Sequence, residues 1–179
     1  YKTVTFYFDA ERHLKRLKNM ALAYSKPGNK LFHEQELRKK IILGLDYFRI
    51  ANPDSGNWWY RDIGAPSQYM IPLLLLKKEL KREDVTRLSS YLVDKTDNMA
   101  HKGKNRTWVS AVLIHKGCIE DDYELIAKGF SSIASWRSRS YRAAVDVGVN
   151  AGIDIGLSSV LIRLLLPCAS FSDWASTSI

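Results

Sequence analysis

Aromatic side chains gather in residues 57–66, directly after a turn-forming segment. Trp58, Trp59 and Tyr60 are adjacent there, and three adjacent rings cannot all face one core. At least one ring should therefore lie at the surface, where a flat aromatic face can stack on a sugar ring through dispersion contacts. Packing at a helix entrance is the alternative, and it would be favoured for a single tryptophan. We place Asn57, Trp58 and Trp59 in a candidate carbohydrate-binding site.

A second candidate segment, residues 101–108, combines a histidine, an amide and several cations around a glycine at a predicted helix start. Backbone N–H groups at a helix start, with cations beside them, can form an anion site suited to a carboxylate or a sulfate. His101, Asn105 and Arg106 are therefore candidate ligand-binding residues. The alternative is that Asn105 only caps the helix, since asparagine is among the best N-cap residues, and the segment taken alone favours the cap.

Helical periodicity predicts the elements that must position these two segments. A first helix ends at a Pro-Gly-Asn turn, and a second covers residues 33–50. A third, over residues 67–80, contains Pro72, which predicts a kink or a late helix start. Further helices are predicted over residues 82–94, 106–116 and 120–135, the last two joined at Gly117. The predicted core positions are Leu14, Leu17, Ala21 and Tyr24 in the first helix and Leu37, Ile41, Leu45 and Phe48 in the second.

Helices joined by short loops pack as antiparallel neighbours, and long series of such hairpins build helical solenoids and α/α toroids. No repeat of fixed period is present, so we predict an all-α fold, an incomplete (α/α) toroid built from antiparallel helical hairpins. Its domain is expected over residues 9–135. Residues 1–8 are strand-like and are expected to be the remnant of a preceding segment, cut inside a longer protein. Residues 136–179 form a divergent tail rich in Ser, Arg and Leu, for which a frame change is one explanation.

Composition sets the bounds on function. The 179 residues are 46% hydrophobic and 26% charged, which are globular values. A formal charge of +8 favours a polyanionic partner, which could be nucleic acid, anionic lipid or acidic glycan. The most apolar window, residues 157–169, is too short to span a bilayer, so no membrane insertion is expected. Cys118 and Cys168 fit no metal-ligand spacing, so we expect two separate buried thiols and no metal site.

The two segments together carry a family resemblance. Residues 57–66, with their Trp-Trp pair and Ile-Gly-Ala-Pro continuation, are followed at a suitable interval by Gly-Lys-Asn-Arg at residues 103–106 and then by Gly117. This pattern resembles the α/α-toroid domain of polysaccharide lyase family 8, which includes chondroitin, hyaluronate and xanthan lyases. Within the family the sequence looks most similar to bacterial chondroitin sulfate ABC lyases.

The resemblance implies roles for the candidate residues. Trp58 and Trp59 match the aromatic patch that positions the glycan, and Asn105 matches the catalytic asparagine that hydrogen-bonds the uronate carboxylate. Removal of the C5 proton places a second negative charge beside that carboxylate, so the carboxylate must be neutralised first. A tyrosine with an assisting histidine then completes a β-elimination. The implied enzyme is periplasmic or secreted and bacterial.

The sequence departs from the family pattern where the histidine and tyrosine are expected. The corresponding residues, 150–167, contain neither type, and His115 and Tyr141 lie too early to replace them. The family's arginine and glutamate would lie beyond Ile179. We therefore expect a lyase fragment that is inactive alone and binds acidic polysaccharide. The alternatives are a non-catalytic glycan-binding module and, less favoured because no nucleic-acid signature is present, a basic nucleic-acid-binding domain. No cofactor is indicated, and a divalent cation in the intact enzyme stays open.

Overall fold

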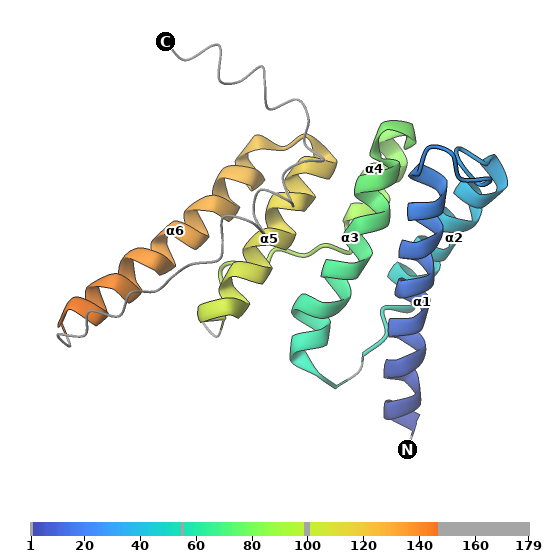
Figure 1. The fold of residues 1–179 in the computed structure, drawn as a ribbon. Helices are drawn as coiled ribbons and strands as arrows, with labels where there is room; N and C mark the ends of the chain where they lie inside the picture. The colour runs from blue at the N-terminus through green and yellow to red at the C-terminus, as the bar shows by residue number, and fades with distance from the viewer. Residues whose placement is uncertain (1, 55, 99–100, 147–179) are drawn as a thin grey trace, which may run out of the picture. The chain divides into compact units, whose positions relative to one another are not determined.

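The computed structural model describes residues 2–54, 56–98 and 101–146, with side chains between residues 9 and 135 (Figure 1). Every regular element in these ranges is helical, which confirms the predicted all-α class. The chain divides into two compact units, Tyr1–Trp136 and Arg137–Ile179. Most of the predicted divergent tail, residues 147–179, lies outside the described residues. The helices are α1 (Lys2–Ser25), α2 (Gln35–Ala51), the π-helical turn η1 (Tyr60–Gly64), α3 (Ala65–Leu76), the 3₁₀ turn η2 (Lys77–Glu79), α4 (Arg82–Ser89), α5 (Gly103–Glu120) and α6 (Tyr123–Asp146).

The core of the first unit forms where α1, α2 and α3 meet (Figure 1). All eight core positions predicted for the first two helices are buried, as the spacing of apolar residues at one helix face requires. Tyr69 of α3 ties three helices together, because its hydroxyl donates to the carbonyl oxygens of Leu45 at 3.3 Å and Leu88 at 3.2 Å. Helix α3 is apolar nearly all round, as suits a helix that packs against several neighbours.

Several predicted boundaries are wrong. Residues 2–8 belong to α1 and do not form an extended segment, because local β-propensity yields to continuation of an amphipathic helix. Pro72 neither delays nor ends α3, which begins at Ala65 and continues past it. The fourth helix stops at Ser89 and not at residue 94.

Gly117 lies inside α5 and is not the junction between helices. The helix ends at Glu120, and its C-cap residue Asp121 adopts the left-handed conformation with φ 57°. The next helix, α6, starts where Asp122 Oδ1 accepts hydrogen bonds from the backbone N–H groups of Glu124 at 2.9 Å and Leu125 at 3.0 Å. This side-chain cap satisfies donors that the first turn leaves without partners, and so defines the start of α6.

The remaining expectations are those for the two cysteines and for membrane insertion. Cys118 is buried, as expected, but it is disulfide-bonded, so the prediction of a separate thiol at this residue is wrong. Cys168 lies outside the described residues. No helix within the described ranges has the length and apolar character needed to cross a bilayer.

Candidate functional site

The aromatic segment is folded by its own side chains. Asn57 Oδ1 accepts a hydrogen bond from the backbone N–H of Trp59 at 3.0 Å, as an N-cap does at the start of a helical turn. Through this hydrogen bond, Asn57, a predicted ligand residue, has a local structural role beside the tryptophans. Its side chain is also exposed. The π-helical turn η1 follows directly and leads into α3. Such turns are rare and occur often at functional sites.

Trp58 and Trp59 form an aromatic pair at the surface, with 47% and 36% of their area exposed. Each has its own support. The Trp58 ring stacks on His101, with centroids 5.6 Å apart and planes inclined by 27°. The Trp59 ring meets Trp108 of α5 edge to face, with centroids 5.8 Å apart. As the sequence predicts, the adjacent aromatics divide between surface and core, because Tyr60 is the one that is buried.

A glycine keeps Trp59 in place. An added Cβ at Gly64 would lie 2.8 Å from Trp59 Cζ3 and 3.0 Å from Tyr60 Cδ2. Real Cβ atoms do not approach other atoms so closely, so the tryptophan ring occupies the space that a side chain at this position would need. The Ile-Gly continuation of the motif therefore serves the packing of Trp59.

A buried carboxylate, which the sequence analysis missed, holds the segment to its neighbours. Asp62 is only 4% exposed and is surrounded by Arg61 at 3.0 Å, Lys95 at 3.6 Å and His101 at 3.5 Å. Burial alone would raise its pKa, but the hydrogen bond from Arg61 and the positive charge of Lys95 outweigh burial and hold the pKa below its ordinary value. The available signal was an acidic residue between Tyr60 and Ile63, since a carboxylate placed among core residues needs partners.

His101 lies beneath the aromatic pair and not at the open surface. It is 3% exposed, with Trp58 stacked on one side and the carboxylate of Asp62 3.5 Å from Nε2. Neither ring nitrogen has a hydrogen-bond partner in the described part of the chain. The structure therefore makes His101 a support that links Asp62 to Trp58.

Asn105 lies in the first turn of α5 and does not cap it, so the capping alternative is wrong. The helix begins at Gly103, whose φ of 55° suits glycine, and the N-cap position is occupied by Lys102 without a side-chain hydrogen bond. Asn105 is partly exposed. Trp108 follows it by three residues on the same side of the helix and touches Trp59, which brings the start of α5 to the aromatic pair.

Arg106 has a structural contact. Its Nη1 donates a hydrogen bond to the backbone carbonyl of Thr96, a residue that is 1% exposed. This contact fixes the segment that follows α4 against the start of α5. Among the described residues, no group of three or more His, Cys, Asp or Glu side chains could hold a metal ion.

Comparison with known proteins places this geometry in context. The protein family described as "Polysaccharide lyase family 8, N terminal alpha-helical domain" matches this chain over residues 4–139. Hyaluronate lyase HylB of Enterococcus faecalis is 26% identical over 151 residues, which cover 70% of this chain and 15% of that protein. Xanthan lyase of Bacillus sp. (strain GL1) is 27% identical over 116 residues, which cover 60% of this chain and 12% of that protein.

A solved structure shares the helical arrangement. The structure of Paenibacillus xanthan lyase superimposes with a TM-score of 0.63 at 27% identity, over 70% of this chain and 13% of that one. The chain thus spans well under a fifth of the length of the relatives it matches. The match covers the aromatic pair, the buried Asp62 and the start of α5. The chain belongs to polysaccharide lyase family 8, within its N-terminal helical domain.

Proposed function

We propose that this chain is the glycan-positioning part of a lyase that cleaves uronic-acid-containing glycosaminoglycans, namely chondroitin or dermatan sulfate and hyaluronan, by β-elimination. The observation that carries the proposal is the aromatic pair, which stays exposed while His101 and Trp108 hold its rings. Rigid aromatic faces bind sugar rings at a small entropic cost. Because such glycans are polymers outside the cell, the intact enzyme would be periplasmic or secreted.

Asn105 is the proposed catalytic residue in this chain. Its amide can hydrogen-bond the uronate carboxylate, while Lys102 and Lys104, both exposed, add positive charge beside the first turn of α5. Together these groups lower the cost of the negative charge that develops when the C5 proton leaves. An amide cannot itself remove the proton, so Asn105 needs a separate base.

His115 is a poor candidate for this base. His115 is 3% exposed within α5, and its Nδ1 lies 2.6 Å from the carbonyl oxygen of Ala111. The segment in which the family resemblance expects a histidine and a tyrosine, residues 150–167, contains neither residue type. We therefore propose that the chain binds acidic glycan but has little or no elimination activity alone.

An absorbance assay for unsaturated uronate tests this proposal. With the 179-residue chain and either hyaluronan or chondroitin, we expect no unsaturated product, because general acid–base groups supply roughly 10²–10⁴-fold each. In a chain extended with a complete family sequence after residue 135, we expect product, and Asn105→Ala should abolish most of it. Robust turnover by the 179-residue chain would contradict the proposal, and His115 and Tyr141 would then be tested as bases.

A non-catalytic acidic-glycan-binding module is the second candidate. It is favoured by the same observation of an exposed aromatic pair, together with the absence of both His and Tyr from residues 150–167. Elimination by the extended chain distinguishes the two, because a binding module would gain no activity from the extension.

A further inference from the structure

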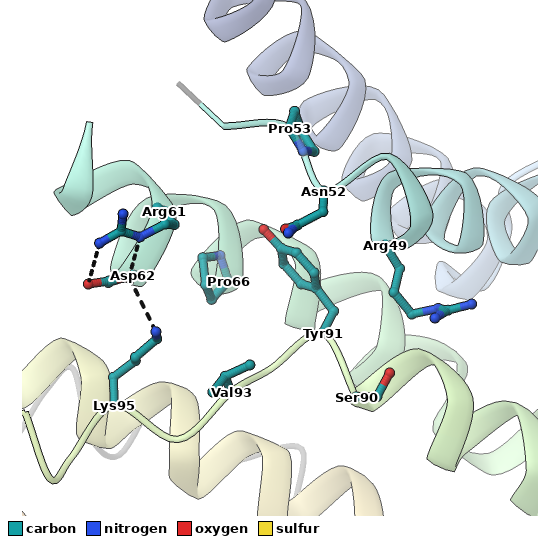
Figure 2. Close-up of a pocket in the computed structure, with 10 residues that line it drawn as sticks. All are labelled: Arg49, Asn52, Pro53, Arg61, Asp62, Pro66, Ser90, Tyr91, Val93 and Lys95. Carbon is teal, nitrogen blue, oxygen red and sulfur yellow. Dashed lines mark hydrogen bonds and ion pairs between the residues drawn. The ribbon is translucent and has the colours of Figure 1, made fainter. Parts of the chain in front are cut away.

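A pocket opens next to the buried Asp62, on the side of Arg61 and Lys95 (Figure 2). Its volume is about 340 Å³, which lies within the usual range for small-molecule sites. Three separate segments line it: the end of α2, the η1–α3 junction and the chain that follows α4. The aromatic pair is not part of the lining, so the pocket is separate from the exposed tryptophans.

Positive charge prevails in this pocket. Arg61 and Lys95 both point toward Asp62, so two cations share one carboxylate and a positive charge remains in excess (Figure 2). Arg49 also lines the pocket, but its guanidinium turns away and is held by Asp46 at 2.8 Å. Lys95 is the looser partner at 3.6 Å and is about one-third exposed, so its ammonium group is available to an incoming anion.

The rest of the lining suits a sugar ring. Pro66, Val93 and the ring of Tyr91 supply apolar surface, and Asn52 supplies an amide next to the Tyr91 hydroxyl (Figure 2). Burial raises the pKa of Tyr91 to about 12, so its phenol is neutral and can donate a hydrogen bond. Aromatic and apolar surface with a few polar groups is the usual composition of a carbohydrate or small-ligand site.

We propose that this pocket binds an anionic sugar residue, carboxylated or sulfated, and gives the glycan a second contact besides the aromatic pair. The proposal rests on the proposed function, because it assumes that the ligand is an acidic glycan. Asp62 connects the two sites, since it contacts His101 beneath Trp58 on one side and Arg61 and Lys95 in the pocket on the other.

Variants of the full chain can test the pocket separately from the aromatic pair. Lys95→Gln removes the available cation, and Asn52→Asp adds a carboxylate where aspartate tolerates the left-handed φ of 37°. Lys78→Gln is the matched control, because Lys78 is exposed and does not line the pocket. Binding is measured by calorimetry with hyaluronan and chondroitin sulfate oligosaccharides of equal length, and melting curves verify that each variant is folded.

We expect Lys95→Gln and Asn52→Asp to weaken binding by about two- to fivefold, as loss of a partly exposed ion pair does, and Lys78→Gln to leave it unchanged. A larger loss for the sulfated ligand would identify sulfate as the bound group, and an equal loss would identify the carboxylate. Unchanged affinity in both pocket variants overturns the inference. If Trp58→Ala still weakens binding in that case, the proposed function stands without the pocket, whereas absence of binding to the unmutated chain rejects both.

Discussion

Single residues decide what the aromatic pair can do. The Trp58 ring stacks on the buried His101, which in turn contacts the buried carboxylate of Asp62. The Trp59 ring contacts Trp108 and fills the space that a side chain at Gly64 would need. The two rings therefore depend on different supports. A glycan that stacks on both rings would find them already ordered, which lowers the entropic cost of binding.

Truncation of either ring should weaken glycan binding. Trp58→Ala or Trp59→Ala is expected to cost about 1–3 kcal/mol with chondroitin oligosaccharides, taking base–aromatic stacking as the analogue. Calorimetry gives the affinity, and Tyr123→Ala is the control because Tyr123 is a 75% exposed aromatic at the start of α6. Trp59→Ala should also lower the melting temperature, since it removes the contact with Trp108. Unchanged affinity in both variants would assign the tryptophans to packing alone.

The sequence predicted the residues that lie at the surface of the candidate site better than those beneath it. Trp58, Trp59 and Asn105 are recognisable from residue type and spacing, because each lies in a short motif whose residues are neighbours in the sequence. The burial of His101 and the partners of Asp62 were not predictable in this way, since they depend on the segment after α4 folding against η1. Long-range contacts of this kind leave no local periodicity to read.

At the scale of elements, the helical faces were predictable and the helix ends were not. Periodicity defines the buried face over several turns, so one misjudged residue does not change it. Helix ends depend on single caps: Asp121 in the left-handed conformation ends α5 beyond Gly117, and Asp122 starts α6. The sequence predicts Gly117 as a junction between helices, whereas its position inside α5 is explained by the close approach of α6.

Substitution of that glycine should separate the two helices. In Gly117→Ala the new Cβ would lie 2.8 Å from the carbonyl oxygen of Asp122 and 2.7 Å from Ile126 Cγ1. We expect a loss of about 1–3 kcal/mol in the free energy of unfolding, because overpacking against backbone outweighs the better helix propensity of alanine. Urea unfolding followed by circular dichroism measures it. Gly44→Ala is the control, since its closest contact is the tip of one flexible side chain, Leu17; equal or greater stability of Gly117→Ala would refute the packing argument.

At the scale of the molecule, some of the positively charged side chains form ion pairs within the fold. Two of the chain's cations pair with carboxylates of other segments: Arg87 of α4 with Asp46 of α2, and Lys128 of α6 with Asp94 in the segment after α4. The formal charge of +8 already subtracts these carboxylates, so the pairs leave the net excess unchanged but hold the paired cations within the fold. For the proposed glycan ligand, local charge would add affinity to a selectivity given by aromatic stacking.

The same ion pairs predict how the fold responds to acid. The pKa values of Asp46, Asp62 and Asp94 lie below their ordinary values, because hydrogen bonds and nearby positive charges outweigh the opposing effect of burial. A carboxyl whose pKa is lower in the folded state stabilises the fold at pH values above its unfolded pKa of about 4. This stabilisation is lost as the pH falls through its pKa in the folded state. These groups should therefore change the melting temperature little between about pH 7 and pH 5. Their protonation should lower it clearly toward about pH 3.

Melting curves followed by circular dichroism between about pH 7 and pH 3 measure this loss of stability. The variant Asp62→Asn is the control. Asp62 is the most buried of the three carboxyls, and asparagine keeps its shape but cannot be protonated. The variant should be less stable at neutral pH, because Arg61 and Lys95 lose their shared partner. It should also lose less stability than the unmutated chain between about pH 5 and pH 3, since one acid-sensitive group is gone. A melting temperature that holds or rises toward pH 3 in the unmutated chain would show that these pairs do not connect the helices energetically.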